Sequence, residues 1–286
     1  MSGKLYVVAT PIGNLADFTF RAVEILQSVD LIAAEDTRHI RLLLQHYAIQ
    51  NQVTSFHQNN EDKKTSELLD KLASGLNIAL VSDAGTPLLS DPGMNLVRLA
   101  RQQGLSVIPI PGPCALIAAL SVAGLPVLGF QFEGFLPRTT SARLALFERR
   151  KDLTSTWVFY ESSHRILAAL EDMSQIFESE RIIVIARELT KLYETVAYGP
   201  LDEILNQVRQ DENMQKGEFV VLVDAAQDKP ANQALSPEQE RILTILLTHC
   251  SIKTAAEIAA EITGGRKKNF YQFALNLQNQ QDKEIF

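Results

Sequence analysis

Short apolar runs alternate with helix-like segments along the first 110 residues, and this alternation most constrains how the chain can fold. The apolar runs, typical of buried strands, are residues 5–9, 31–34, 53–56, 78–81 and 106–110. Helix-like segments lie between them at residues 15–28, 37–46, 65–74 and 95–103, with Thr65 as the expected N-cap of the third. Strands that alternate with helices predict a mainly parallel α/β sheet.

The pattern changes after a small apolar helix predicted at residues 115–123. Further strands are predicted at residues 130–135, 156–160, 181–186 and 218–223, with helices at residues 165–175 and 201–207. A polar stretch then leads to predicted helices at residues 237–247, 254–262 and 267–277. We therefore predict an α/β fold of two lobes, residues 1–114 and 115–224, followed by a linker at residues 225–235 and a small helical tail at residues 236–286.

Charge and cysteine usage exclude several classes of protein. Lys and Arg total 27 against 34 Asp and Glu, and this net charge of −7 is not that of a general nucleic-acid binder. Any RNA substrate therefore requires locally clustered basic residues. Cys114 and Cys250 lie far apart, which excludes a disulfide framework and argues against a cysteine zinc site. Because the chain has no signal-peptide pattern and no apolar run of membrane-spanning length, we expect a soluble cytoplasmic protein.

Loops that carry glycine or proline follow several predicted strands, at residues 10–15, 82–87, 90–93 and 111–113. Glycine lets the backbone approach a ligand closely, and proline fixes the shape of a loop. Any one of these loops is also explained as an ordinary strand-to-helix turn. Four together, two of them with Asp, favour a ligand cleft beyond the carboxyl ends of the strands. None matches GxGxxG, a P-loop or a GxSxG nucleophile elbow.

Charged clusters also follow predicted strands. The first, Glu35-Asp36-Thr37-Arg38, lies at a strand-to-helix junction, where Asp36 or Thr37 would also serve simply as a helix N-cap. The others, residues 159–165 and 187–194, are alternatively explained as solvated surface. The histidines are scattered along the chain and predict no metal site.

Two basic stretches are candidate phosphate-binding surfaces. Residues 137–151 carry five cations against the single acid Glu148. Residues 265–271 combine three cations with Phe270 and Tyr271, and cations next to aromatic rings suit single-stranded RNA. The alternative for the second stretch is a solvated helix start whose two aromatic side chains pack inward.

Several of these segments together resemble a known family. The segments are residues 6–15, 35–38, 82–87, 90–93, 111–113, 134–137, 159–165 and 187–191. In this order they resemble the ribosomal RNA small subunit methyltransferase I family of the tetrapyrrole-methylase superfamily, from about Leu5 to Asp224 and into the tail. Cys114 and Ser163 depart from the Ser and Pro that are common in relatives.

The resemblance implies a class III methyltransferase whose two α/β lobes hold S-adenosylmethionine in the cleft between them. It also implies a homodimer that methylates the ribose 2′-oxygen of a decoding-centre cytidine in 16S rRNA of the 30S subunit. Residues 130–135 are a candidate for the dimer interface. The positions that the resemblance assigns to the cofactor are Pro11, Ser82, Asp83, Ala84, Gly85, Thr86, Leu89, Pro113, Ala115, Tyr160, Glu161 and Leu189.

A ribose hydroxyl is a poor nucleophile at neutral pH, so a general base or a polarising group is expected in the cleft. The catalytic assignments are Glu35, Asp36, Arg38, Glu188 and Lys191, and the RNA-binding ones are Arg38, His57, Arg138, Arg143, Arg266, Lys267 and Lys268. The base is left open among Glu35, Asp36, His57 and Glu188. In the competing view no single base exists and these groups form ion pairs that order the substrate.

Two other functions compete with rRNA methylation. The same enzyme class would also methylate a tetrapyrrole precursor or a protein side chain, against which the Glu35-to-Arg38 motif and the basic tail favour RNA. A non-catalytic RNA-binding or ribosome-assembly protein with a vestigial cleft is the other alternative. The intact glycine-bearing loops argue against that one.

Overall fold

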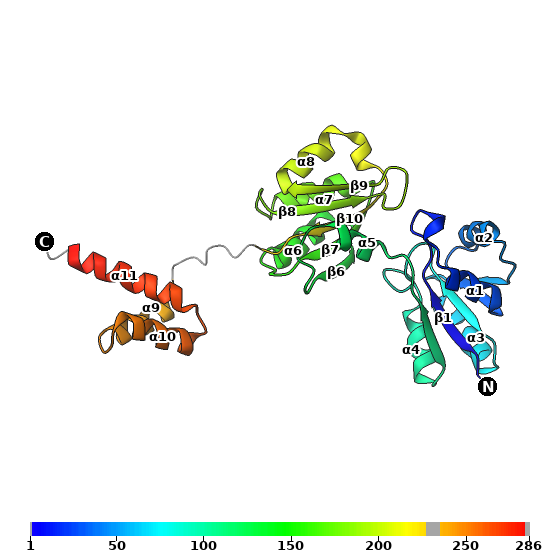
Figure 1. The fold of residues 1–286 in the computed structure, drawn as a ribbon, viewed down its shortest axis with the longest axis horizontal. Helices are drawn as coiled ribbons and strands as arrows, with labels where there is room; N and C mark the ends of the chain where they lie inside the picture. Colours follow the sequence, from blue (N-terminus) through cyan, green and yellow to red (C-terminus); the bar gives the residue numbers. More distant parts are fainter. Residues whose placement is uncertain (1, 227–234, 284–286) are drawn as a thin grey trace. The chain divides into compact units, whose positions relative to one another are not determined.

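The computed structural model describes residues 2–226 and 235–283, with side chains to residue 277 in the last helix (Figure 1). The chain forms two compact units, residues 1–225 and 226–286, and each is described by itself. Most of the predicted linker, residues 227–234, lies outside the described residues. The predicted domain boundaries stay predictions.

The first sheet has the strand order β3-β2-β4-β1-β5, and all of its neighbouring strands are parallel. Its strands are β1 (Lys4–Val8), β2 (Leu31–Ala34), β3 (Val53–Ser55), β4 (Ile78–Val81) and β5 (Ser106–Ile110). Residues of β2 and β4 are buried throughout, as expected for a parallel sheet covered on both faces. The parallel arrangement brings the loops that follow β1, β2, β4 and β5 to one edge of the sheet.

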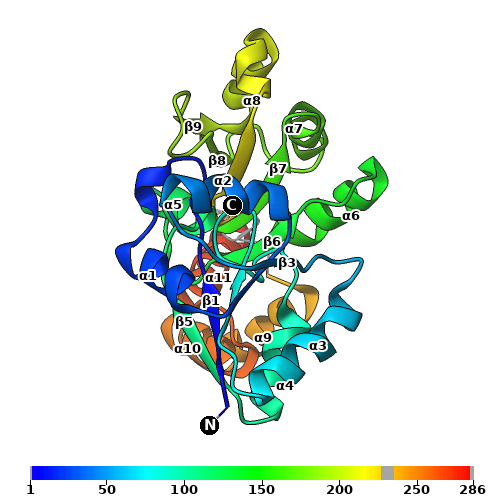
Figure 2. The same cartoon turned by 90° about the vertical axis from the view of Figure 1, so that its right-hand side faces the viewer.

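Helices cover both faces of this sheet. Apolar side chains of α1 (Phe20–Ser28) and α2 (Thr37–His46) pack on one face, and those of α3 (Glu61–Ala73) and α4 (Met94–Gln102) pack on the other. Figure 2 shows α1 on one side of β1, with α3 and α4 on the opposite side. This doubly covered sheet confirms the parallel α/β lobe predicted from the alternation of strands and helices.

Two of the predicted helices begin elsewhere than expected. Thr65 is buried inside α3, which starts four residues earlier at Glu61, so it is not the N-cap. The predicted helix at residues 15–28 is divided into a 3-10 turn, η1 (Leu15–Asp17), and α1. The division follows from Thr19, whose side chain accepts the amide hydrogen of Ala22 and thereby caps α1.

The second lobe contains a mixed sheet of order β6-β7-β10-β8-β9, in which only β6 and β7 pair in parallel among the described strands. Its strands are β6 (Gln131–Phe135), β7 (Trp157–Ser162), β8 (Ile182–Arg187), β9 (Thr195–Pro200) and β10 (Glu218–Val223). Strand β9 was not predicted from the sequence, and its residues are alternately half-buried and exposed over its first four positions. It pairs antiparallel with β8 and is an edge strand of the second sheet.

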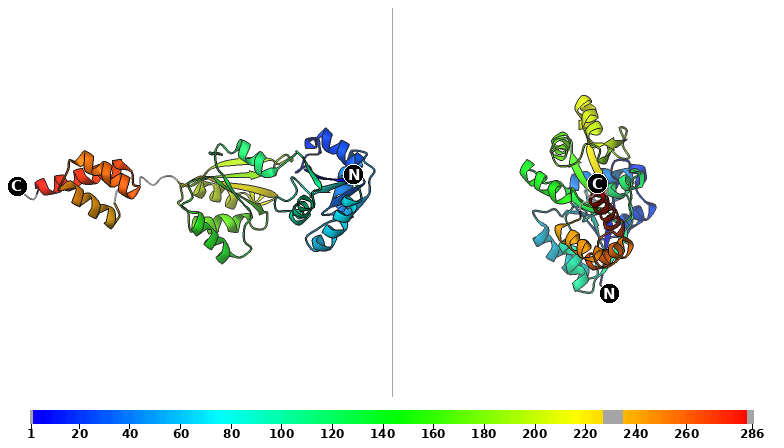
Figure 3. Two further views of the ribbon diagram at one scale, coloured as in Figure 1. Left: turned by 90° about the horizontal axis from the view of Figure 1, so that it is seen from below. Right: turned by 90° about the vertical axis from the view of Figure 1, so that its left-hand side faces the viewer.

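Helices of the second lobe are divided unequally between the faces of this sheet. The short helix α5 (Ala115–Val122) packs on one face, and α6 (Thr140–Arg150), α7 (Ile166–Ser174) and α8 (Leu201–Gln210) pack on the other. A 3-10 turn, η2 (Glu212–Gln215), follows α8. The left view of Figure 3 shows α5 and α6 on opposite sides of the sheet.

The second unit is a helical module with a core of its own. Its described helices are α9 (Pro237–Leu247), α10 (Ile252–Thr263) and α11 (Lys267–Lys283). A capping box of Ser236 and Gln239 starts α9, and Gly264 in the left-handed conformation ends α10. Phe270 is fully buried in this core, whereas Tyr271 is exposed, so only one of the two aromatic side chains packs inward.

Candidate functional site

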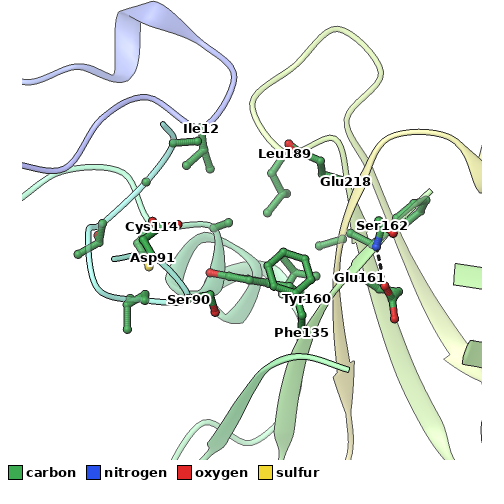
Figure 4. A pocket seen from close by; sticks show the side chains of 18 of the residues that line it. Ile12, Ser90, Asp91, Cys114, Phe135, Tyr160, Glu161, Ser162, Leu189 and Glu218 are labelled. Atoms are coloured by element: carbon green, nitrogen blue, oxygen red, sulfur yellow. Dashed lines mark hydrogen bonds between the residues drawn. The ribbon is translucent and has the colours of Figure 1, made fainter. Parts of the chain in front are cut away.

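A cavity of about 350 Å³ lies where the carboxyl-end loops of the first sheet meet the second lobe. This volume falls within the range of small-molecule sites, roughly 300–1,000 Å³. The first lobe contributes the loops after β1, β4 and β5, and the second contributes β6, β7, β10 and the segment from β8 to Lys191 (Figure 4). The glycine-bearing loops therefore converge on one pocket.

Most residues assigned to the cofactor line this cavity. They are Asp83, Ala84, Gly85, Thr86, Leu89, Ala115, Tyr160, Glu161 and Leu189. The other three, Pro11, Ser82 and Pro113, lie in the loops that shape the cavity without being part of its lining. The carbonyl oxygen of Pro113 accepts a hydrogen bond from Thr86 Oγ1 at 3.2 Å. All twelve remain predicted cofactor positions.

Backbone hydrogen bonds hold two of these loops together. The amide of Thr10 donates to the carbonyl of Gly85 at 2.9 Å, and the amide of Gly85 donates back to Thr10 at 3.0 Å. Gly85 has a φ of +79°, which favours glycine, and a Cβ there would lie 3.4 Å from Ile12 Cγ2. A side chain at this position would therefore occupy space along the cavity wall.

Tyr160 forms the aromatic part of the second-lobe wall. Its hydroxyl oxygen accepts the amide hydrogen of Leu116 at 3.1 Å, and its ring meets those of Phe132 and Phe135 edge-on. Burial raises the pKa of the Tyr160 hydroxyl to about 12, so this group stays protonated at neutral pH. In Figure 4 the side chain points towards the side of the pocket where Cys114 and Asp91 lie.

Glu161, the next residue, is almost completely buried. Its carboxylate accepts the amide hydrogen of Ser162 at 2.8 Å and pairs with Arg165 at 3.0 Å. Burial raises the pKa of this carboxyl, and the Ser162 amide and Arg165 act against that rise. The side chain of Arg165 in turn donates to the carbonyls of Leu136 and Pro137, so the network fixes the loop after β6.

The cluster predicted at residues 35–38 adjoins the cavity without lining it. The amide of Asp36 donates to Asp83 Oδ1 at 2.9 Å. Asp36 also caps α2 through the amide of Arg38, which confirms the N-cap explanation for this residue, and its carboxylate pairs with the Arg38 guanidinium at 2.7 Å. The Arg38 hydrogen bonds lower the pKa of Asp36, whereas burial and the nearby Asp91 and Asp83 raise that of Glu35.

Lys191 and Glu188 belong to an ion-pair cluster at the second-lobe side of the cavity. Lys191 Nζ lies 2.8 Å from Glu188 Oε1 and 2.8 Å from Glu218 Oε2, and Lys191 and Glu218 line the cavity whereas Glu188 does not. Burial would raise the pKa of Glu188, but the hydrogen bonds from Lys191 and the Glu218 amide lower it overall. Burial would lower the pKa of Lys191, but its two carboxylate partners raise it overall.

Unusual backbone conformations cluster at the same place. Leu88, Ser90, Glu188 and Thr190 have φ values of +75°, +72°, +51° and +68°, and among the described non-glycine residues only Ala48 shares this property. Positive φ is unfavourable for such side chains and persists where the surrounding structure imposes it, often at functional sites. Leu88 and Ser90 lie in the first lobe, and Glu188 and Thr190 lie in the second, in loops beside the cavity.

The residues assigned to RNA binding have different surroundings. The side chain of Arg38 is 87% exposed, Arg138 is exposed and His57 is half-buried. In the helical module, Arg266 directly precedes α11 and Lys267 and Lys268 are its first residues, and Lys267 pairs with Glu257 at 2.8 Å.

The surroundings of Arg143 do not fit its predicted role in RNA binding. It is only 4% exposed, and its guanidinium pairs with Asp172 at 2.6 Å and donates to the Arg138 carbonyl at 3.0 Å. A guanidinium that is buried and bonded in this way does not reach a phosphate of RNA. The structural role of Arg143 could not be predicted from the basic stretch, because its partner Asp172 is 29 residues away in α7.

Several cavity residues were not assigned from the sequence, namely Ile12, Ser90, Asp91, Cys114, Phe135, Ser162, Ala186, Glu218, Phe219 and Val220. Asp91 lies in a loop that the sequence analysis singled out, so a signal for it existed. Glu218 and its neighbours belong to a strand with no distinguishing motif. Among the residues that the structure describes, no cluster of His, Cys, Asp and Glu could hold a metal ion, and no helix is long and apolar enough to cross a membrane.

Comparisons with known proteins identify the family. Residues 4–205 match the family Tetrapyrrole (Corrin/Porphyrin) Methylases, and residues 233–278 match the RsmI C-terminal HTH domain. Ribosomal RNA small subunit methyltransferase I of Escherichia coli O157:H7 is 50% identical over 276 residues, which cover 96% of either chain. This chain belongs to the ribosomal RNA small subunit methyltransferase I family. A family member from Xylella fastidiosa strain Temecula1 is 51% identical over 94% of this chain and 98% of its own length.

Solved structures of more distant proteins share the fold of the two lobes. A diphthine synthase, 14% identical, superposes with a TM-score of 0.62 over 78% of this chain and 90% of its own. A uroporphyrin-III-C-methyltransferase from Thermus thermophilus, 16% identical, gives 0.55 over 78% and 95%. These structures and the family match confirm the predicted tetrapyrrole-methylase fold class.

Proposed function

We propose that this chain transfers the methyl group of S-adenosylmethionine to the ribose 2′-oxygen of a cytidine in 16S rRNA. The observation that carries the proposal is the near-full-length identity of about half to relatives named ribosomal RNA small subunit methyltransferase I. That name supports methylation of small-subunit rRNA. The choice of a cytidine and of its 2′-oxygen rests on the resemblance described for the sequence.

The cavity fits a sulfonium nucleoside as cofactor. Its size suits such a ligand, Gly85 leaves room along one wall, and apolar side chains such as Ile12 and Leu189 line it together with the Tyr160 ring. When bound, S-adenosylmethionine supplies an activated methyl group. Loops of the first lobe and the β7 and β8 ends of the second would hold it, through the twelve residues assigned to the cofactor.

The acceptor must reach the cavity from solvent. Arg38 at the start of α2 and Lys191 at the cavity present cations that suit the phosphates beside a target ribose. We propose that Arg38, His57 and Arg138 contact RNA from the first unit and that Arg266, Lys267 and Lys268 contact it from the second. The match of residues 233–278 to a helix-turn-helix domain supports the latter role.

We also propose a homodimer, because the second lobe exposes several large apolar side chains. These side chains belong to α5, to the loop after it and to β9, and Leu128 is 98% exposed. They are Ile117, Val122, Val127, Leu128, Val196 and Tyr198. Large exposed apolar side chains often mark protein association, and a second copy would cover them. The cytoplasmic location that we propose follows from the ribosomal substrate.

One experiment tests the proposed function against its alternatives. The purified protein is incubated with methyl-labelled S-adenosylmethionine and 30S subunits, deproteinised 16S rRNA or a tetrapyrrole precursor. We expect label in 16S rRNA, in a nucleotide that resists alkaline cleavage on its 3′ side because its 2′-oxygen is methylated. Label in the tetrapyrrole or in a ribosomal protein would favour the other substrates of this fold. Cofactor uptake without transfer to any of these would favour a non-catalytic role.

A further inference from the structure

The loop between β8 and β9 ends in a turn with two large side chains at its tip. The amide of Glu194 donates to the carbonyl of Lys191 at 3.1 Å, which closes the turn. Leu192 and Tyr193 are its two central residues, at positions that favour Gly, Pro, Asn, Asp or Ser. Their exposed fractions are 88% and 67%. A plain solvated surface, the alternative explanation for this segment, would have polar side chains at the tip.

This turn lies directly beside the cavity. Lys191, its first residue, lines the cavity, and so does Leu189 two residues earlier, which Figure 4 shows on the second-lobe side of the pocket. Consecutive Cα atoms are about 3.8 Å apart, so the Cα of Tyr193 lies within about 8 Å of that of Lys191. A Cβ at Gly13 of the first lobe would collide with the Lys191 side chain. The turn is therefore at the edge of the cavity where loops of the two lobes meet.

Hydrogen bonds hold the backbone of the turn in place. The carbonyl of Tyr193 accepts from the buried guanidinium of Arg187 at 3.0 Å and from the hydroxyl of Thr195 at 3.1 Å. The carboxylate of Glu194 accepts the amide hydrogen of Thr190 at 2.6 Å, which joins this turn to the preceding part of the loop. Side chains on a backbone constrained in this way are already positioned for a partner, which lowers the entropy cost of binding.

The chemistry of the tip fits the bases of RNA better than its phosphates. The cavity of about 350 Å³ is the size of one small-molecule site, so with the cofactor inside it the bases that flank the target ribose remain outside, at its edge. Unpaired bases stack on aromatic rings, and a Leu side chain can insert between stacked bases. Phosphates require cations, and neither Leu192 nor Tyr193 carries a charge. A second copy of the chain at this place would compete with the RNA for the edge of the cavity.

Resting on the proposed function, we propose that Leu192 and Tyr193 bind the bases beside the target nucleotide. The ring of Tyr193 stacks on one unpaired base, and Leu192 separates that base from its neighbour. The ribose between them is thereby turned towards the cavity. The two side chains act on the binding and positioning of the RNA and take no part in methyl or proton transfer.

The first test compares the affinity of the wild type and of Tyr193→Ala for 30S subunits at several salt concentrations. Stacking of one base on an aromatic ring corresponds to roughly 5- to 150-fold in affinity, and we expect a loss of this size. Because stacking releases no counterions, the slope of log affinity against log salt should stay unchanged. Tyr193→Phe keeps the ring and should retain most of the affinity, and all variants should bind S-adenosylmethionine normally in calorimetry.

The second test identifies what the tip contacts. Tyr193 is replaced by the photo-crosslinking amino acid p-benzoylphenylalanine, and the protein is irradiated together with 30S subunits. We expect a cross-link to 16S rRNA at a nucleotide next to the one that acquires the methyl label. The matched control is the same replacement of Phe20 in α1, which is 90% exposed and does not line the cavity, and it should not cross-link to that nucleotide.

Several results would overturn the assignment. They are wild-type affinity in Tyr193→Ala, an equal loss of affinity in Tyr193→Phe, and the absence of a cross-link from position 193 to 16S rRNA. A cross-link only to a second copy of the chain would assign the turn to a dimer interface instead. Failure of the wild type to methylate 16S rRNA would overturn the proposed function, and it is distinguishable because binding and cross-linking are measured without methyl transfer.

Discussion

Gly13 touches the opposite lobe at a point that leaves no room for a side chain. A Cβ at this position would collide with the Lys191 side chain and lie 3.0 Å from Thr190 Oγ1. We expect Gly13→Ala to displace Lys191 from Glu188 and Glu218 and to reduce kcat roughly 10- to 100-fold, because misplacement by an ångström far from the reacting atoms has such effects. Methylation kinetics measure the loss.

The control for Gly13→Ala is Gly199→Ala in β9, where a Cβ would lie an ordinary 3.7 Å from Ile204 Cδ1. This control should keep the wild-type rate. Equal rates for the wild type and Gly13→Ala would show that the contact between Gly13 and Lys191 is unimportant for catalysis.

Asp91 should also affect stability in a pH-dependent way. Burial raises its pKa in the folded protein from an ordinary 3.8 to about 6. Below pH 3.8 the carboxyl is protonated in both states and has no effect. Between the two pKa values the unfolded chain ionises first, so stability falls as pH rises, and the penalty is complete above pH 6. Asp91→Asn removes that penalty, and its Tm should exceed that of the wild type by more at pH 7.5 than at pH 4.5. A Tm difference that stays constant across this range would contradict the burial of a charged Asp91.

At the scale of helices and strands, Arg143 of α6 and Asp172 of α7 tie two helices together. Both side chains are buried, and Arg143 also donates to carbonyls of the loop before α6. Arg143→Ala leaves the Asp172 carboxylate buried without its cation, which costs about 3–5 kcal/mol of folding free energy. Urea unfolding should show this loss, whereas the exposed Arg149→Ala should change stability by less than about 0.5 kcal/mol. Equal stabilities for the two variants would show that Arg143 does not stabilise the fold.

The elements that the sequence predicts well are those whose burial is complete. Both faces of β2 and β4 are covered, so their residues form unbroken apolar runs. In contrast, β9 is an edge strand that starts at Thr195 with alternate exposed residues, and its pairing with β8 depends on tertiary structure. Thr65 resembles a cap locally, but the preceding Glu61 and Asp62 also favour the helix N-terminus.

Similar reasons explain what could be predicted of the candidate site. Loops after parallel strands meet at one edge of a sheet, so the convergence of residues 82–87 on a pocket followed from the strand pattern. Contacts between residues that lie far apart in the sequence could not be predicted in this way. Arg143 pairs with a residue 29 positions away, and Lys191 pairs with Glu218, 27 positions away, so both ion pairs are visible only in three dimensions.

At the scale of the whole molecule, the chain forms two units with separate cores. The cavity and its loops lie in residues 1–225, and the module that matches a helix-turn-helix domain follows. A chain that ends at residue 226 should therefore keep the wild-type affinity for S-adenosylmethionine and show a raised KM for 16S rRNA. Calorimetry and methylation kinetics test the two parts of this prediction separately.

The salt dependence of RNA affinity tests whether the second unit contacts phosphates of the RNA. If Arg266, Lys267 and Lys268 each contact a phosphate, replacing all three by Ala should lower the slope of log affinity against log salt by roughly 2. The full-length chain with these substitutions should then bind RNA like the truncated chain at low salt, because both lack the same electrostatic contacts. A truncated chain with normal RNA affinity would assign RNA binding to the first unit alone. A triple variant that binds RNA normally while the truncated chain does not would place the contact elsewhere on the module, where the exposed Tyr271 of α11 is the next side chain to replace.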